Sequence, residues 1–294
     1  MQVGFVGLGN MGLPMAKNLV AKGISVAGYD LAEGARAALG EAGGRAAGTA
    51  PEAVAEADAV VTALPAARHV RGLLIEDGLF SAAPEGTLFI DCSTIDVATA
   101  RALAVAAQSA GRSYLDCPMS GGVGGAEAGT LSFMVGGEAA DFARAEPVLA
   151  AMGRNIFHAG GPGAGAAAKI CNNLMLAIQM IAVSEGFNLA EKLGLEAQKL
   201  YDISSTATAR CWSLNDYCPA PGPQPKAPSN RDYAPGFAAE LMLKDLRLAM
   251  EAVEATGVSS PLGAAATQLY ALMALRGQAD RDFSGIIRLL RGEG

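Results

Sequence analysis

Three glycines near the start of the chain have the spacing of a phosphate-binding turn. Gly7, Gly9 and Gly12 form the pattern G-x-G-x-x-G between a strand-like run, Val3–Val6, and a helical pattern that continues to about Lys22. Gly7 would permit a tight turn, Gly9 the close approach of a pyrophosphate, and Gly12 the packing of helix against strand. The helix start would offer its N–H groups to the phosphates. Read alone, the glycines could also serve an ordinary strand–helix turn.

An aspartate after the next strand-like run completes this pattern. Asp30 follows Ser25–Tyr29, and no arginine comes after it before Arg36. A carboxylate in this place can accept hydrogen bonds from both ribose hydroxyls and would repel a 2′-phosphate. The sequence therefore predicts a dinucleotide-binding βαβ unit that takes NAD in preference to NADP. The cofactor-contacting residues expected in this unit are Gly7, Leu8, Gly9, Asn10, Met11, Gly12 and Asp30.

A lysine and two asparagines interrupt a long apolar helical pattern. Lys169, Asn172 and Asn173 have the spacing i, i+3 and i+4, so they share one helix face, which continues to Leu176 and Met180. Lysine is seldom fully buried, and the pattern alone favours a lysine that reaches water near a helix start, beside two solvent-facing amides. A buried lysine here would instead be a candidate proton acceptor, because an apolar setting lowers the pKa of an ammonium group.

A serine and two glycines follow another strand-like run. Ser120, Gly121 and Gly122 come shortly after Tyr114–Asp116, at the strand end where open α/β sheets bind ligands. A hydroxyl beside successive N–H groups suits a carboxylate. The spacing is equally typical of a flexible glycine turn.

The elements around these residues change type along the chain. Strand and helix signals alternate to about residue 160, which predicts a mostly parallel sheet covered by helices. Later the strand signal stops, and helices are expected over 165–193, 196–208, 236–256 and 283–290. The expected fold is α/β, with a Rossmann-type, doubly wound, mostly parallel sheet in residues 1–162 and an all-α domain in 163–294, joined by a long helix. The expected strands are Val3–Val6, Ser25–Tyr29, Ala59–Ala63, Leu88–Asp91, Tyr114–Asp116, Ser132–Val135 and Ile156–His158.

A proline-rich segment, residues 211–236, interrupts the helical part. It should contain neither helix nor central strand, because proline disrupts both. It holds the only tryptophan, Trp212, which favours an ordered loop packed against other residues.

Composition limits the partners and the location. The net charge of −7 and the lack of a basic stripe argue against nucleic acid. The apolar segments are too short for a bilayer span, so no membrane partner is expected, and the start of the chain resembles no signal peptide.

The five cysteines form no CxxC pair, which favours reduced thiols in the cytoplasm, with Cys171 expected to pack in the core. No metal site is expected: His69 is interpreted as a surface residue and His158 as a structural one.

Four segments, in order along the whole chain, resemble the motifs of the β-hydroxyacid dehydrogenase family. They are "FVGLGNMGLPMA", "DCPMSGGVGGAEAGTLSFMVGG", "GAAAKICNN" and "LKDLRLA". The resemblance implies that Lys169 and Asn173 are catalytic and that Ser120, Gly121 and Gly122 anchor a substrate carboxylate, with Asn173 and Trp212 also at the substrate. It implies that Leu64, Pro65, Ser93, Thr94 and Lys244 contact the cofactor and that Asp245 supports the site.

Within this family, "IDCSTI" and "MGRNIFHAG" are most similar to the bacterial members that oxidise 3-hydroxyisobutyrate in valine breakdown. The resemblance implies oxidation to methylmalonate semialdehyde, with hydride transfer to NAD and Lys169 as the proton acceptor. L-serine, 3-hydroxypropionate and tartronate semialdehyde stay open as substrates because the sequence pattern says little about the pocket around C2. A non-catalytic dinucleotide-binding module is the alternative from another class. The family also implies a homodimer or homotetramer.

Overall fold

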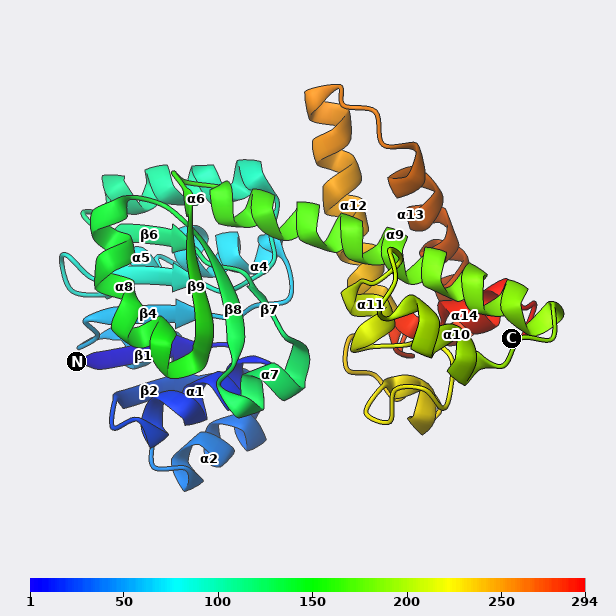
Figure 1. The fold of residues 1–294 in the computed structure, drawn as a ribbon. Helices are drawn as coiled ribbons and strands as arrows, with labels where there is room; N and C mark the ends of the chain where they lie inside the picture. The colour runs from blue at the N-terminus through cyan, green and yellow to red at the C-terminus, as the bar shows by residue number, and fades with distance from the viewer. Residues whose placement is uncertain (294) are drawn as a thin grey trace. The chain divides into compact units, whose positions relative to one another are not determined.

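The first part of the chain, Met1–Lys169, is built on one nine-stranded sheet (Figure 1). The computed structural model describes residues 1–293. Six parallel strands have the order β3-β2-β1-β4-β5-β6, which is the order of a doubly wound dinucleotide-binding sheet. β8 then runs antiparallel to β6 and β7, and β9 runs parallel to β8. The predicted mostly parallel sheet is thus confirmed. The strands are β1 Gln2–Val6, β2 Ser25–Tyr29, β3 Arg45–Ala46, β4 Ala59–Thr62, β5 Leu88–Asp91, β6 Ser113–Asp116, β7 Met119–Ser120, β8 Leu131–Gly136 and β9 Gly153–Gly160.

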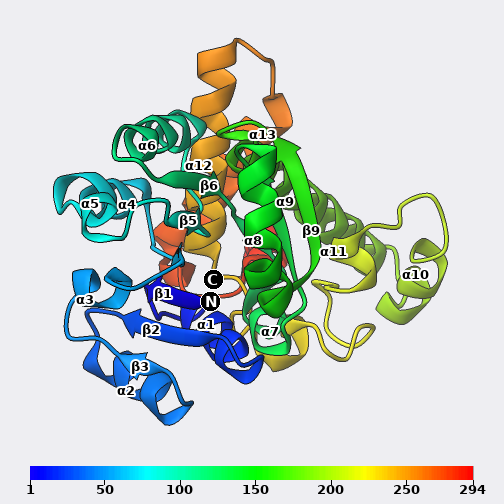
Figure 2. The ribbon, with the colours of Figure 1, turned by 90° about the vertical axis from the view of Figure 1, so that its left-hand side faces the viewer.

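Helices cover both faces of this sheet, as Figure 2 shows. Alternate strand residues supply the two apolar layers: Val61 of β4 packs in the layer of α1, α7 and α8, and Val60 packs in the layer of α3, α5 and α6. The sheet is therefore buried on both sides, as parallel sheets usually are. The helices of this first unit are α1 Gly12–Ala21, α2 Glu33–Glu41, α3 Ala50–Val54, α4 Ala67–Arg71, the π-helical turn η1 Gly72–Glu76, α5 Leu79–Ala82, α6 Val97–Ser109, α7 Gly122–Ala128 and α8 Ala139–Met152.

The second unit begins at Ile170, inside the long helix α9. Its core joins α9 to α12 and α13 through Met180, Met242 and Tyr270. Gly257 ends α12 with φ of 70°, which glycine adopts readily, and Pro261 occupies the first turn of α13. The long helix and the helical C-terminal part are confirmed. The elements are α9 Ala164–Lys192, α10 Ala197–Ser204, α11 Trp212–Asn215, η2 Pro228–Arg231, α12 Ala239–Thr256, α13 Pro261–Met273, η3 Ala274–Gln278, η4 Phe283–Gly285 and α14 Ile286–Leu290.

Three local expectations are corrected. The segment 211–236 is not free of helix, since it contains α11 and the 3-10 turn η2. Helix α11 can form because its four residues contain no proline. Strands β3 and β7 are two residues long, too short to give a period-two pattern. Helix α10 ends at Ser204 and not at Thr208.

The length and composition of helix α9 contradict the expectation that the apolar segments are too short to span a bilayer. By length and composition α9 passes that test, and 33% of its most apolar 18 residues are buried inside the structure. Helices that pack in a protein core or interface meet the same criterion, so composition alone does not place α9 in a membrane.

Candidate active site

The glycine loop after β1 leaves space only at its middle glycine. Gly7 has φ of +97°, a conformation that L side chains rarely adopt. A Cβ on Gly12 would overlap the carbonyl oxygen of Gly7, so helix and loop are in direct backbone contact. At Gly9 no heavy atom lies within 4 Å of the position a Cβ would take. The loop backbone is therefore open at Gly9, where a pyrophosphate must approach.

Asp30 is fixed by two backbone N–H groups, one of which belongs to this loop. Its Oδ2 accepts a 2.7 Å hydrogen bond from the N–H of Leu8, and its Oδ1 accepts one of 2.8 Å from the N–H of Ala32. Arg36, six positions further along, donates to the carbonyl oxygen of Asp30 over 2.6 Å. Both a carboxylate and a guanidinium therefore lie at the end of β2, although Arg36 follows Asp30 by six positions in the chain.

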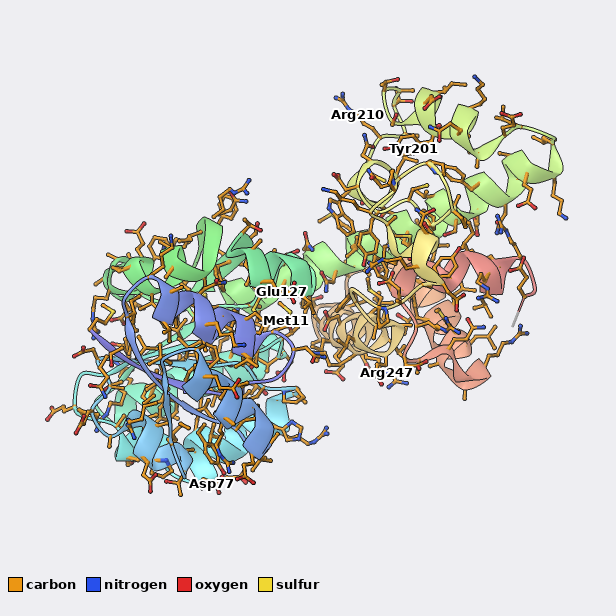
Figure 3. The ribbon with its side chains drawn as sticks, turned by 90° about the horizontal axis from the view of Figure 1, so that it is seen from below. Met11, Asp77, Glu127, Tyr201, Arg210 and Arg247 are labelled. Carbon is orange, nitrogen blue, oxygen red and sulfur yellow. The ribbon has the colours of Figure 1, made fainter. Side chains whose placement is uncertain are left out.

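A side-chain hydrogen bond joins α1, which the glycine loop opens, to α7. Asn18 Nδ2 on α1 donates to the carbonyl oxygen of Ala126 on α7 over 2.6 Å. Figure 3 labels Met11, just before α1, and Glu127 on α7. Because α7 begins at Gly122, this bond ties the cofactor-side helix to the segment that carries the Ser-Gly-Gly turn.

A buried aspartate organises the loops after β4 and β5. Asp91 accepts hydrogen bonds from the Thr62 hydroxyl at 2.7 Å, the Tyr114 hydroxyl at 3.0 Å and the N–H of Ser93 at 3.1 Å. The hydroxyl of Ser93 in turn accepts the N–H of Leu64 at 2.9 Å. Burial raises the pKa of Asp91, and these hydrogen bonds oppose the rise.

Sequence reasoning missed Asp91. The signal was available, since a carboxylate that ends a fully buried four-residue strand requires partners. The predicted residues Leu64, Pro65, Ser93 and Thr94 all lie in the loops that follow β4 and β5, at the carboxyl ends of adjacent parallel strands.

The Ser-Gly-Gly turn has a backbone that requires glycine. Ser120 pairs with Ser132 across the β7–β8 ladder. Gly121 and Gly122 then have φ of 133° and 62°, outside the range of ordinary L residues. The turn between β7 and α7 therefore needs glycine at both positions because of its backbone conformation.

Lys169 and Asn173 are both buried. Their exposed fractions are 7% and 1%, and Asn172 is half-buried. Asn172 Nδ2 donates to Asn173 Oδ1 over 3.0 Å, and Asn173 Nδ2 donates to the carboxylate of Asp245 over 2.5 Å. The interpretation that the pattern alone favoured, a lysine that reaches water beside two solvent-facing amides, is therefore wrong.

On α12, Lys244 lies beside Asp245, the aspartate that accepts the hydrogen bond from Asn173. Its Nζ is 3.3 Å from Asp245 Oδ1, and the lysine side chain is 31% exposed, whereas that of Asp245 is 3% exposed. Lys244 therefore forms an ion pair with a carboxylate that is nearly inaccessible to solvent.

An aromatic stack fixes the tryptophan of the 211–236 segment. Trp212 lies 4.6 Å from Tyr217 between ring centroids, and Tyr217 lies 5.5 Å from Phe283. The Tyr217 hydroxyl donates to the buried Asp282 over 2.9 Å. Trp212 nevertheless stays 47% exposed, so a supported aromatic face is available on the surface.

Three further residues were assigned structural or surface positions from the sequence. Cys171 is exposed, which corrects the expectation that it packs in the core. His69 is exposed on α4. His158 lies on β9 with Nε2 2.8 Å from the carbonyl oxygen of Gly137 and its ring stacked on Phe142.

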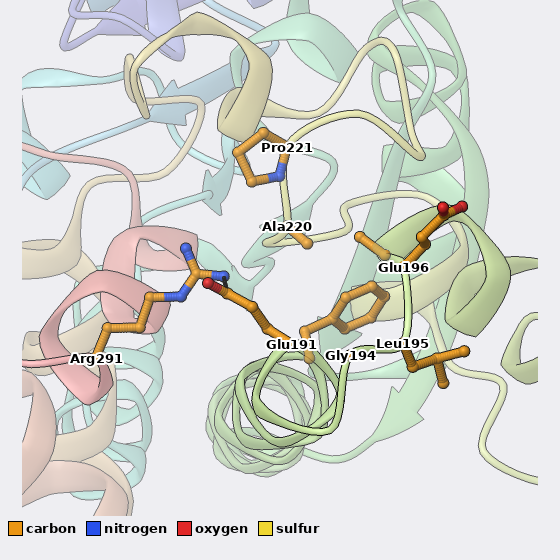
Figure 4. Close-up of a pocket in the computed structure, with 9 residues that line it drawn as sticks. Glu191, Gly194, Leu195, Glu196, Ala220, Pro221 and Arg291 are labelled. Carbon is orange, nitrogen blue, oxygen red and sulfur yellow. Dashed lines mark ion pairs between the residues drawn. The ribbon is translucent and has the colours of Figure 1, made fainter.

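A pocket of about 300 Å³ in the second unit contains none of the predicted site residues (Figure 4). It lies between the end of α9 and the proline-rich segment, with Phe187 and Pro221 in its wall. Two charged residues of its wall, Glu191 and Arg291, form an ion pair with each other, with 2.7 Å between Arg291 Nη2 and Glu191 Oε2. Within residues 1–293, no three His, Cys, Asp or Glu side chains cluster as metal ligands would.

Comparison with known proteins covers nearly the whole chain. Residues 2–160 match the family described as the NAD binding domain of 6-phosphogluconate dehydrogenase, and residues 163–290 match the NAD-binding domain of NADP-dependent 3-hydroxyisobutyrate dehydrogenase. The probable 3-hydroxyisobutyrate dehydrogenase of Mycobacterium tuberculosis H37Rv is 51% identical over 98% of this chain and 97% of its own. The chain belongs to the 3-hydroxyisobutyrate dehydrogenase family of β-hydroxyacid dehydrogenases.

Other members of the family differ in their named substrate. A Pseudomonas aeruginosa protein named NAD-dependent L-serine dehydrogenase is 47% identical over 98% of this chain and 97% of its own. The solved Mycobacterium tuberculosis 3-hydroxyisobutyrate dehydrogenase with L-serine has 51% identity and a TM-score of 0.93, and the match covers 99% of both chains. As a member of this family, the chain is an NAD(P)-dependent 3-hydroxyacid dehydrogenase that acts on a small hydroxyacid with a dinucleotide.

Proposed function

We propose that this enzyme oxidises 3-hydroxyisobutyrate to methylmalonate semialdehyde with NAD. The observation that carries the proposal is the burial of Lys169, four residues before the buried Asn173 on the same helix. A buried amine beside a fixed amide is suited to move a proton at one oxygen atom, whereas a surface lysine would not be.

Glycine-loop and Asp30 geometry supports NAD as the cofactor. The open backbone at Gly9 fits a pyrophosphate, and the fixed carboxylate of Asp30 fits a ribose diol. NAD bound there would supply the acceptor for the hydride that leaves the hydroxyl-bearing carbon. The residues proposed to hold it are Gly7, Leu8, Gly9, Asn10, Met11, Gly12, Asp30, Leu64, Pro65, Ser93, Thr94 and Lys244.

In the proposed reaction, Ser120 and the N–H groups of Gly121 and Gly122 bind the substrate carboxylate, and Trp212 contacts the rest of the substrate. Lys169 accepts the hydroxyl proton during oxidation and returns it during reduction. One N–H of the Asn173 amide is used by Asp245, and the other can donate to the substrate oxygen. Holding the alcohol in this way can lower the barrier by about 7–11 kcal/mol.

The test is Lys169→Ala beside Lys199→Ala, a control that removes an exposed lysine from α10. The Lys169 variant should lose at least about 100-fold in kcat, the lower range for a general base, while NAD still binds. Lys199→Ala should keep wild-type turnover. Near-normal turnover of Lys169→Ala would reject the assigned base.

L-serine is the second candidate substrate. It shares the carboxylate and the primary alcohol, and two relatives carry its name in their descriptions, one as substrate and one as the molecule present in the structure. NADH formation measured with 3-hydroxyisobutyrate, L-serine and 3-hydroxypropionate, and NADH consumption measured with the aldehyde tartronate semialdehyde, decide between them. A kcat/KM for L-serine at least tenfold above that for 3-hydroxyisobutyrate would replace the first proposal. A chain that binds NAD but turns over none of them would be the non-catalytic module.

A homo-oligomer is proposed from one face of α9. The residues called here the α9 seam are exposed and recur at intervals of three, four or seven residues: Met175, Ala182, Gly186 and Leu189 in α9, and Leu193, which directly follows it. Met175, Leu189 and Leu193 are 56%, 61% and 75% exposed. Small residues in the middle of such a seam allow two helices to approach closely. A second copy of the chain is the proposed occupant, and the cytoplasm is the proposed location.

A further inference from the structure

The long helix α9 begins on a buried carboxylate. Asp116, the last residue of β6, is 1% exposed. Its Oδ1 accepts the N–H of Gly163 over 2.7 Å, and its Oδ2 accepts the N–H of Ala166 over 2.8 Å. Both donors belong to the group of N–H groups that a helix start cannot satisfy internally. A negative charge at this end also complements the helix dipole.

The contact between the helix start and the sheet has no free space. Asp116 pairs with Gly136 across β6 and β8. A Cβ on Gly136 would lie 2.6 Å from both Asp116 Oδ1 and the N atom of Gly165. A Cβ on Gly165 would overlap the carbonyl oxygens of Asp116 and Met134. The first turn of α9 is therefore seated directly on the ends of two strands.

Asp116 stands between the two groups that must face one substrate. Along the chain it is followed by buried Cys117 and Pro118 and then by β7, which ends at Ser120. Through its carboxylate it holds Ala166, and Lys169 comes less than one helical turn later. All these residues belong to the first unit.

We propose that Asp116 is a positioning residue, which fixes the proton-accepting Lys169 at a set distance from the Ser-Gly-Gly turn. This inference rests on the proposed role of Lys169. It assigns no contact between Asp116 and substrate. The carboxylate acts through the backbone of α9, so its loss should damage catalysis without weakening the cofactor loop after β1.

The experiment is a double-mutant cycle of Asp116→Asn and Lys169→Ala, read as kcat and as the Kd for NAD. Asparagine keeps the shape but presents an amide N–H to one of the two backbone donors. In the wild-type background Asp116→Asn should lower kcat about 100-fold, the loss that a displacement of about 1 Å can cause. The Kd for NAD should stay within about twofold. In the Lys169→Ala background the same change should alter the residual rate by less than about threefold.

Thr49→Ala is the matched control. Thr49 caps α3 by accepting the N–H of Glu52 over 3.3 Å, and α3 carries none of the proposed site residues. The Thr49→Ala change should leave kcat unchanged. If Asp116→Asn does not fold, Asp116→Ser is used in the same cycle, because it removes the charge and keeps one short acceptor.

Each outcome separates the two proposals. Normal turnover of Lys169→Ala rejects the proposed base. If kcat collapses in Lys169→Ala and Asp116→Asn lowers kcat by the same factor in both backgrounds, Asp116 is merely structural and the inference is overturned. An unchanged kcat in Asp116→Asn, or a Kd for NAD that rises in step with the loss of kcat, also overturns it.

Discussion

Asn173 on α9 donates a 2.5 Å hydrogen bond to Asp245 on α12, 72 positions later in the chain. Both side chains are nearly inaccessible to solvent. The bond fixes which way the Asn173 amide points, because the carboxylate can only accept. The orientation of a proposed catalytic amide is therefore set by a residue on another helix.

Asp245→Ala should lower kcat about tenfold to 100-fold and reduce the free energy of unfolding by about 1–3 kcal/mol, because a buried amide loses its acceptor. Steady-state kinetics and urea unfolding measure the two effects. Glu251→Ala, an exposed change on the same helix, is the control and should alter neither. Wild-type kcat in Asp245→Ala would show that the amide is oriented by other contacts.

Asp30→Ser should raise the kcat/KM ratio of NADP to NAD by about tenfold to 100-fold, which corresponds to about 1–3 kcal/mol. The carboxylate that would repel a 2′-phosphate is removed, while Arg36 stays at the same strand end. Adding Arg36→Ala to Asp30→Ser should cancel part of the gain in NADP use. An unchanged ratio in Asp30→Ser would remove the basis for the proposed NAD preference.

Asp91 should give the enzyme a stability that falls as pH rises above about 4. Burial raises its pKa in the folded protein above the ordinary value of 3.8, so between those two values the folded state binds more protons than the unfolded state. The free energy of unfolding therefore decreases with pH in this window, by at most about 1.4 kcal/mol per pH unit for one group.

Asp91→Asn removes this titration and should flatten the slope. A partial slope should persist, and it is assigned to Asp116, because burial also raises the pKa of that carboxyl group. Urea unfolding from pH 4 to pH 7 compares the two proteins. Parallel curves would show that Asp91 does not titrate in this range.

Leu189→Glu combined with Leu193→Glu should dissociate the proposed oligomer, because two charges would be buried in the α9 seam. Light scattering after size-exclusion chromatography should give the mass of one chain. The control pair Leu262→Glu and Leu275→Glu changes leucines that are 65% and 85% exposed outside the seam. It should keep the wild-type mass. A wild-type mass in the seam variant would place any interface elsewhere.

Much of the fold could be predicted because its signals are local. Strand–helix alternation, the glycine loop and stops such as Gly257 depend on neighbouring residues. Two-residue strands such as β3 could not be predicted, since their existence depends on pairing with β2. The hydrogen-bond partners of Asp91 and Asp116 could not be predicted either, because the groups that donate to these carboxylates lie up to 50 positions away in the chain.

The candidate site shows the same limit at Lys169. Its spacing and its family motif could be read from the chain, but burial is a property of the packed structure, and the pattern alone favoured the wrong environment. The hydrogen bond between Asn173 and Asp245 could not be predicted either, because the two residues lie 72 positions apart, and the family resemblance implied only that Asp245 supports the site.

The aromatic stack at Trp212 makes one part of this protein optically distinct. The chain contains a single tryptophan, so its long-wavelength emission arises from one side chain at the surface of the 211–236 segment. That side chain rests on Tyr217, which is anchored through Asp282. Changes in its emission on addition of a hydroxyacid therefore report on this segment alone, without a label and without turnover.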